Sequence, residues 1–248
     1  MEKQKKKNDG IKKEWKVPKR KQRVWRVFRL FFKPFFGVKS IEFLGEKFPD
    51  KCIIVSNHSN KRGPMVYELN LPVFHASWGA YQMLGNYSSR FHYLRDVLYI
   101  QKNGFNKFKA TLKASFEAIF SYSVYKGMKI LPSFPDARLR KTLQYSMDML
   151  DAGNAVSVYP EDSNQGYFDE MTHFFPGFVM LAQMYYKKTG KDLPVFPVYY
   201  GKNKKKIVVG KPLYVQELAN QGLNRDEIAD KFRLEVNQLY YDHFKEDK

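Results

Sequence analysis

Short apolar runs alternate with longer amphipathic runs from residue 38 to the end of the chain. The runs "KCIIVSN", "NAVSVYP" and "LPVFPVYYG" have the length and the β-branched content of buried strands. The segments 106–126 and 133–153 between them show helical periodicity. Strands separated by helices predict an α/β fold, in which a central, mostly parallel sheet is flanked by helices. No linker divides residues 37–248, so we expect one domain there.

The segment 106–126 is predicted to form a helix that faces the core with its large apolar residues. Four of them recur at helical spacing: Leu112, Phe116, Ile119 and Phe120. A second helix is expected after Ser133, with this serine as its N-cap, Pro135 in its first turn and Gly153 at its end. A third is expected from the possible cap Asn224 onward. The segments "LPVFPVYYG" and "KKIVVGKP" flank a basic turn and predict paired strands.

Positive charge is concentrated at the N-terminus. Residues 1–33 contain 14 Lys or Arg and three Asp or Glu, in a chain with a net charge of +18. The stretch 22–37, "QRVWRVFRLFFKPFFG", predicts a basic amphipathic helix rich in aromatic residues, which suits an anionic membrane surface. Its apolar face contains Val24, Phe28, Phe31 and Phe35. We expect residues 1–36 to be a basic tail and a membrane-surface helix; a helix docked on the protein's own core and an RNA-binding arm are the alternatives.

Composition excludes several classes of protein. The single cysteine, Cys52, excludes a disulfide framework and a zinc site of several thiolates, and it suits a reducing compartment. The charged N-terminus without an apolar region behind it predicts no signal peptide, and no window is apolar enough to span a bilayer. The expected location is therefore cytoplasmic and peripheral, on the inner face of the membrane. The histidines lack metal-ligand spacing, so no metal site is expected.

The stretch 56–64, "SNHSNKRGP", follows an apolar strand run. His58 is expected at a strand end, where α/β enzymes place their ligands, and histidine is the natural general base near neutral pH. Lys61 and Arg62 would attract a phosphate. The alternative is an ordinary polar loop with a solvated histidine.

Two further stretches are candidate sites. In "VSVYPEDSNQGYFDE", Glu161 and Asp162 follow a strand and would lie at the same sheet edge as His58 if the two strands are parallel. At the start of the helix after Ser133, Arg138 and Arg140 would hold an anion together with exposed backbone N–H groups. The alternatives are a turn with solvated acids and a solvated basic face.

The order of four stretches resembles the motif blocks of the glycerolipid acyltransferases, the superfamily of the lysophosphatidic acid (1-acylglycerol-3-phosphate) acyltransferases. The stretches are "IIVSNHS" followed by "GP", "GMKILPS", "VSVYPEDS" and "LPVFPVYY", and the resemblance spans about residues 38–215. It implies an O-acyltransferase of phospholipid biosynthesis that moves a fatty acyl group from acyl-CoA or acyl carrier protein to the hydroxyl of a lysophospholipid. It implies no cofactor beyond this acyl donor.

The resemblance assigns roles to residues and exposes departures. His58 matches the catalytic base, Asn57 the asparagine before it, and Glu161 the glutamate that contacts the acceptor. The sequence departs from the family's pattern in three places. Gly63 stands in place of the family's aspartate, and Ser133 in place of its phosphate-binding arginine. The family's Gly-Thr-Arg is replaced by Asp162, Ser163 and Asn164.

The departures leave two functions to be supplied by other groups. Loss of an orienting acid costs about 10⁴-fold in a serine protease triad, so Asp162, Glu68 or a backbone carbonyl is expected to orient His58. Phosphate is expected to bind to nearby cations. The expected catalytic residues are His58 and Glu161; the expected substrate-binding residues are Asn57, Lys61, Arg62, Ser133, Arg138, Arg140, Asp162, Ser163 and Asn164.

Two other functions remain open. Gly63 supports a lipid-binding protein of this fold that has little or no transferase activity. The basic N-terminus is also compatible with a nucleic-acid-binding protein, although the aromatic content of the N-terminal helix exceeds what phosphate contact needs, so no nucleic-acid partner is expected. The predicted partners are an anionic membrane surface, an acyl donor and a lysophospholipid acceptor.

Overall fold

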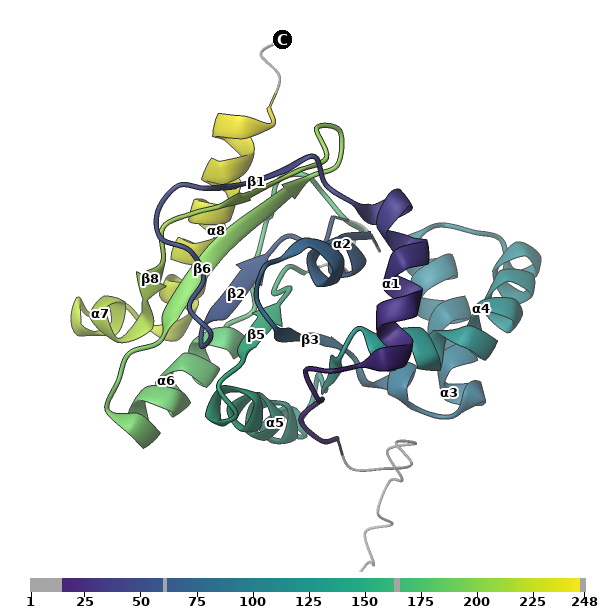
Figure 1. Ribbon diagram of the computed structural model, residues 1–248, viewed down its shortest axis with the longest axis horizontal. Helices are drawn as coiled ribbons and strands as arrows, with labels where there is room; N and C mark the ends of the chain where they lie inside the picture. The colour runs from purple at the N-terminus through teal and green to yellow at the C-terminus, as the bar shows by residue number, and fades with distance from the viewer. Residues whose placement is uncertain (1–14, 60–61, 163–165, 246–248) are drawn as a thin grey trace, which may run out of the picture.

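The computed structural model describes residues 15–59, 62–162 and 166–245, and an eight-stranded mixed sheet lies at its centre (Figure 1). The strand order is β1-β7-β6-β2-β5-β3-β4, and β8 also pairs with β6. Strands β6, β2, β5, β3 and β4 are parallel to one another, whereas β7 and β8 are antiparallel to β6. The predicted α/β class is confirmed. The strands are β1 Ser40–Phe43, β2 Ile53–Ser56, β3 His75–Ala80, β4 Ile130–Ser133, β5 Ala155–Val158, β6 Pro194–Gly201, β7 Lys206–Val209 and β8 Leu213–Tyr214.

Helices cover both faces of the sheet, and β2 is buried between them. Ile53 and Val55 belong to the core on one face, while Cys52 and Ile54 belong to the core on the other, as the two-residue period of a strand requires. Cys52 is fully buried. The first face is covered by α5 Leu139–Asp151, α6 Gly177–Thr189, α7 Val215–Asn220 and α8 Arg225–His243. The second is covered by α2 Gly63–Asn70 and the end of α1 Arg23–Phe36.

Several element predictions are confirmed. Strands β6 and β7 pair antiparallel on either side of the basic turn. Asn224 caps α8: its side chain accepts from the backbone N–H of Glu227, whose side chain accepts from the N–H of Asn224. This reciprocal pair satisfies two donors that a helix start otherwise leaves without partners.

The start of α5 was wrongly predicted. Ser133 is the last residue of β4, paired with Ala80 of β3, and the helix begins only at Leu139. Thr142 instead ties the two elements together. Its hydroxyl donates to the carbonyl of Pro132 at 3.0 Å and accepts from the N–H of Phe134 at 3.2 Å. Sheet pairing therefore extends β4 through the residue that resembled a cap.

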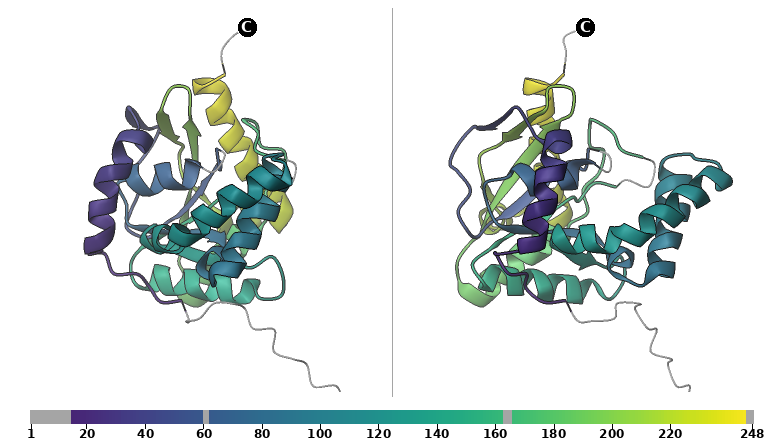
Figure 2. Two further views of the ribbon diagram at one scale, coloured as in Figure 1. Left: turned by 90° about the vertical axis from the view of Figure 1, so that its right-hand side faces the viewer. Right: turned by 45° about the vertical axis from the view of Figure 1, so that its right-hand side comes forward.

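The chain between β3 and β4 forms a helical lobe, which projects from the sheet beside α1 (Figures 1 and 2). It has a core of its own, which contains Met83, Leu94 and Tyr99. Within the described ranges of the chain, no helix is long and apolar enough to cross a bilayer. The lobe consists of η2 Tyr81–Leu84, α3 Tyr87–His92, the π-helical η3 Tyr93–Lys102 and α4 Lys107–Gly127.

The buried face of α4 is the opposite of the predicted one. The helix packs on α3 and η3 through alanines at i, i+4 and i+8, which are fully buried: Ala110, Ala114 and Ala118. Short side chains allow the helices to approach closely, and this packing turns the large residues outward. The prediction of core positions is therefore wrong for all four residues, which are 56–69% exposed: Leu112, Phe116, Ile119 and Phe120.

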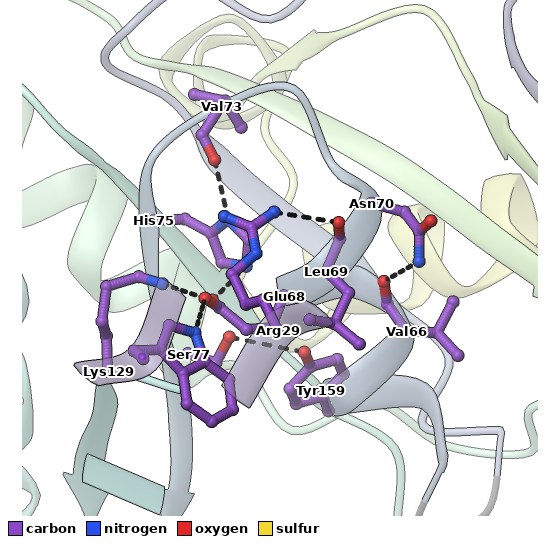
Figure 3. A network of polar contacts seen from close by, with 11 residues as sticks. Arg29, Val66, Glu68, Leu69, Asn70, Val73, His75, Ser77, Lys129 and Tyr159 are labelled. Carbon is purple, nitrogen blue, oxygen red and sulfur yellow. Dashed lines mark hydrogen bonds and ion pairs between the residues drawn. The ribbon is translucent and has the colours of Figure 1, made fainter. Parts of the chain in front are cut away.

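Helix α1 is attached to the domain by a buried polar cluster (Figure 3). The indole of Trp25 packs on Gly127, where an added Cβ would lie 2.2 Å from the ring, and its N–H donates to Oε1 of Glu68 at 3.0 Å. Lys129 forms an ion pair with the same oxygen. His75 Nε2 lies 3.9 Å from the other Glu68 oxygen. Burial lowers the pKa of Lys129 and of His75, and in both cases the charge of Glu68 opposes that shift.

Removing the charge of Glu68 is expected to destabilise the fold. Glu68→Gln would leave the buried Lys129 ammonium facing a neutral amide, and breaking a buried ion pair in this way costs about 3–5 kcal/mol. Urea denaturation would measure the loss in the free energy of unfolding. The double variant Glu68→Gln/Lys129→Met removes both charges and should recover much of the loss. Additive effects of the two substitutions would show that the pair is not coupled.

Candidate active site

The ends of β2 and β5 bring His58 and Glu161 into direct contact. The strands are parallel neighbours, with Val55 opposite Val158, so the chain leaves both of them at the same edge of the sheet. There the backbone N–H of His58 donates a 3.0 Å hydrogen bond to Oε1 of Glu161. A bridge between Glu161 and Phe174 holds the segment that carries the carboxyl group. The two residues proposed as catalytic therefore lie side by side.

Asn57 fixes the turn that carries His58. Its side chain is buried, and Oδ1 accepts hydrogen bonds from the Tyr67 hydroxyl at 2.6 Å and from the Tyr200 N–H at 2.9 Å. Its Nδ2 donates to the Tyr200 carbonyl at 3.2 Å. These bonds join the end of β2 to α2 and β6, so Asn57 holds His58 in place. Contact between Asn57 and a substrate stays a prediction.

Two tyrosines hold the imidazole of His58. The Tyr167 ring stacks on it with centroids 4.7 Å apart and an interplanar angle of 24°. The Tyr159 ring meets it edge-on at 5.3 Å. Burial raises the pKa of Tyr159 to about 12, which keeps its phenol neutral. The imidazole therefore lies in an aromatic setting that restricts its orientation and its access to water.

Burial also changes the acidity of Glu161. It raises the pKa of the carboxyl to about 7, against the hydrogen bond from His58 N–H and the charge of Lys102, which both lower it. Such a group exchanges a proton near neutral pH. Carboxyl groups with pKa values shifted in this way are found preferentially at functional sites.

The shifted pKa of Glu161 predicts a pH-dependent stability. Because the folded carboxyl binds its proton more tightly than an unfolded glutamate with a pKa of 4.5, its contribution is complete below that pH and is lost as the pH rises through about 7. Glu161→Gln should remove this loss. Between pH 5 and pH 8, the free energy of unfolding of the variant should rise by about 2 kcal/mol relative to that of wild type, after allowance for the partial exposure of Glu161. Urea denaturation across this range is the measurement; identical profiles for the two proteins would contradict it.

Lys102 is a charged residue of the site that sequence reasoning missed. It ends η3, and its ammonium lies 5.3 Å from the centroid of the Tyr167 ring. Burial lowers its pKa, while the charges of Glu161 and Asp162 raise it. No local motif marks Lys102. The path of the helical lobe brings it to the strand ends, and this path could not be read from the residues around it. Among the described residues, the positive charge that lowers the pKa of Glu161 is that of Lys102, which lies outside the four motif blocks.

The arrangement of sheet and helices is similar to that of a known enzyme. The crystal structure of the 1-acyl-sn-glycerophosphate (LPA) acyltransferase, PlsC, from Thermotoga maritima matches with a TM-score of 0.50, over 91% of this chain and 82% of that chain, at 16% sequence identity. The chain has a glycerolipid acyltransferase-like fold. No protein-family model and no curated protein matches the sequence. At this identity the likeness establishes the fold, and the chemistry is inferred from the site itself.

Gly63 stands where the acyltransferases that the sequence resembles have aspartate. It is buried and begins α2. A Cβ added at Gly63 would lie 2.0 Å from the carbonyl oxygen of His58 and 2.7 Å from its carbonyl carbon. Both distances are far below van der Waals contact. The aspartate is therefore not simply missing: in this acyltransferase-like fold, the path of the His58 backbone leaves room for glycine alone.

The two carboxylates expected to orient His58 lie in different places. Glu68 belongs to the cluster with Trp25 and Lys129. Asp162 follows Glu161 at the strand edge, and its N–H donates to the His173 carbonyl at 3.2 Å. Of these two carboxylates, Asp162 is the one at this strand edge, where its charge acts on Lys102; that it orients His58 stays a prediction.

The predicted phosphate-binding residues are spread along the sheet edge. Arg62 precedes α2, and its guanidinium lies 5.4 Å from the centroid of the Phe36 ring. Ser133 ends β4, three strands from β2, which is roughly 14 Å at the usual strand spacing. Arg138 pairs with Asp136 at 2.7 Å and lies over the ring of Tyr81 in the lobe, while Arg140 is exposed. Three predicted residues lie outside the described part of the chain: Lys61, Ser163 and Asn164.

An acidic cavity of about 500 Å³ borders Asp162. Its lining includes three carboxyl groups, which makes it unsuitable for a phosphate. Among the described residues, no three His, Cys, Asp or Glu side chains are grouped as metal ligands. The cavity is lined by Asp162, Phe168, Asp169, Glu170, Thr172, Tyr240 and Lys245.

Proposed function

We propose that this protein is an acyltransferase that moves a fatty acyl group from a thioester donor, acyl-CoA or acyl carrier protein, to the hydroxyl of a lysophospholipid. A lysophospholipid such as 1-acylglycerol-3-phosphate would place the reaction in phospholipid biosynthesis. The observation that carries the proposal is the direct contact between His58 and Glu161 at the strand ends of an acyltransferase-like fold.

The proposed chemistry begins with the imidazole of His58. It takes the proton from the acceptor hydroxyl while that oxygen attacks the thioester carbonyl. The new C–O bond forms, the C–S bond breaks, and the proton passes to the departing thiolate. Tyr159 and Tyr167 keep the imidazole in position, while Glu161 holds the His58 backbone and contacts the acceptor.

The acceptor phosphate would be met by cations around this site. Lys61 and Arg62 follow His58 in the chain, and Lys102 reaches the site from the lobe. Ser133, Arg138 and Arg140 would meet a phosphate at the β4 end of the same edge. Asp162, Ser163 and Asn164, which follow β5, would bind hydroxyl groups of the acceptor. These roles follow from position and charge.

We assign residues 1–36 to attachment and residues 37–248 to catalysis. Helix α1 carries arginines and a lysine together with exposed apolar residues, a combination that binds the surface of anionic bilayers. The protein would act peripherally, on the cytoplasmic face of the membrane, where its lipid acceptor resides. The exposed apolar residues of α1 are Val27, Phe28, Leu30, Phe31 and Phe35.

A second candidate function is lipid binding without turnover. The close contact between Gly63 and the His58 carbonyl favours it, because the usual partner of the base has no place in this backbone. Such a protein would bind acyl-CoA or lysophospholipid and transfer nothing.

Acyl transfer assays distinguish the two functions. Purified protein is supplied with radiolabelled acyl-CoA or acyl carrier protein and a panel of lysophospholipids and simpler glycerol phosphates. The proposal predicts labelled diacyl product, and its loss when His58 is replaced. Binding of both substrates without product under any donor and acceptor combination would overturn the enzyme proposal and favour the lipid-binding protein.

A further inference from the structure

Helix α4 presents a ridge of large apolar side chains to solvent. The ridge consists of residues 56–81% exposed: Phe108, Leu112, Phe116, Ile119 and Phe120. They extend over three turns of helix, or roughly 18 Å. Scattered apolar residues are common on protein surfaces, but a contiguous aromatic ridge of this kind marks an interaction site.

The ridge points directly away from the protein. Leu112 and Phe116 each lie two residues from the buried Ala114, which places them about 160° around the helix from it. The ridge also borders a shallow, mainly apolar groove of about 360 Å³, lined in part by Val124 and Tyr125. No rotation of these side chains can return them to the core of the lobe, since alanine already fills the contact with α3 and η3.

The charges on α4 indicate the partner. Its four lysines accompany a single acidic residue, Glu117. Lys109 and Lys113 are exposed, and both lie over the Phe105 ring at the start of the helix. Apolar side chains flanked by lysines complement the acyl region and the anionic headgroups of a bilayer. In a symmetric dimer this patch would be present on both copies, so an excess of positive charge would lie on both sides of the contact, which disfavours it.

The surface of α1 continues toward this ridge. Trp25 packs on Gly127 at the end of α4, and Phe32 shares a cluster with Val124. Arg29 donates to the Leu69 carbonyl of α2, on the other side of α1. The apolar residues Val27 and Phe31 lie about 160° from Arg29 around the helix, so they face away from α2. Helix α1 contacts both α2 and α4, and in Figure 1 it lies between α2 and the lobe that contains α4.

We propose that α4 is a second membrane-contacting helix, which inserts its aromatic ridge into the anionic surface of a phospholipid bilayer beside α1. Attachment at two helices would fix the orientation of the domain on the bilayer. This inference extends the proposed attachment through α1, but it does not depend on acyl transfer, and its tests use no substrate.

Site-specific labelling tests which helix enters the bilayer. The only cysteine in the chain, Cys52, is fully buried and burial raises the pKa of its thiol, so an introduced surface cysteine is the reactive one. An environment-sensitive fluorophore is attached at Phe116→Cys, at Phe31→Cys on α1 and at Leu234→Cys. Leu234 is an exposed control on α8, which packs on the opposite face of the sheet from α2.

Vesicles of phosphatidylcholine with about 30% phosphatidylglycerol, an anionic surface, should shift the fluorescence at positions 116 and 31 to the blue and leave position 234 unchanged. A response at position 31 without one at position 116 would overturn the proposal and leave attachment through α1 intact. Equal responses with pure phosphatidylcholine would overturn the anionic requirement.

Partition measurements give the strength of the contact. Phe116→Ser/Phe120→Ser should lower the vesicle partition coefficient by roughly tenfold, whereas Leu234→Ser should not change it. Lys109→Glu/Lys113→Glu should lower it by at least about fivefold and remove much of its salt dependence. Analytical ultracentrifugation without lipid completes the test. A dimer that the serine variants convert to monomer would identify the ridge as a contact between copies and overturn the membrane assignment.

Discussion

Replacing His58 by alanine is expected to lower acyl transfer by a factor of about 10²–10⁴, the usual contribution of a positioned general base. Imidazole is a side-chain group that can accept a hydroxyl proton near neutral pH, as a general base must. Its backbone contacts are independent of its side chain: the N–H of His58 still donates to Glu161 in the variant. The initial rate with labelled donor, at saturating acceptor, is the measurement.

Two controls accompany this measurement: the melting temperature of His58→Ala and the transfer rate of a variant at a second, exposed histidine. His58→Ala removes the ring contacts with Tyr159 and Tyr167, so its melting temperature should fall by only a few degrees. His92→Ala changes an exposed histidine on α3 and should retain the wild-type rate. If His58→Ala transfers acyl groups as fast as wild type, His58 is not the base.

Replacing Gly63 by aspartate is expected to damage the protein rather than complete its active site. The added Cβ would lie 2.0 Å from the His58 carbonyl oxygen, and the neighbour in question is backbone, which cannot rotate away. Overpacking and displaced backbone should cost at least about 3 kcal/mol of unfolding free energy. Acyl transfer should fall as well, since the displaced residue is the proposed base. Gly63→Ala should show most of the same loss, because the clash arises at Cβ.

A substitution at a glycine with no close neighbour is the control, because it shows the cost of replacing glycine without a steric clash. Gly104 has φ of +65° and nothing within 4 Å of an added Cβ, so Gly104→Ala should cost only about 1 kcal/mol. A Gly63→Asp variant that keeps its stability and transfers acyl groups faster than wild type would contradict the geometry. It would show that the backbone of His58 can move aside and that the chain tolerates the usual dyad.

The candidate site was largely predictable because its residues follow strands. Each apolar run marked a strand, so the sequence placed His58 and Glu161 at one edge on the condition that the two strands are parallel, and β2 and β5 are parallel neighbours. Lys102 was not predictable, because no motif marks it. Tyr167 lies in the stretch after β5, but nothing in the sequence indicates that its ring stacks on His58. The resemblance to glycerolipid acyltransferases likewise located Gly63 but gave no reason for it; the contact with the His58 carbonyl supplies that reason.

Local signals and tertiary contacts decided different features of this protein. The sequence by itself determined the α/β class, the helix cap at Asn224 and the strand ends that carry the site, because periodicity and capping act over a few residues. Only the tertiary structure decided which face of α4 is buried. Helical periodicity identifies an apolar face, but it contains no information about the partner, and three small alanines packed more closely than the large residues opposite them. The tertiary structure also decided the pKa of Glu161. Parts of the chain that are distant in sequence bury its carboxyl group, and this loss of water raises its pKa above the usual value of a glutamate.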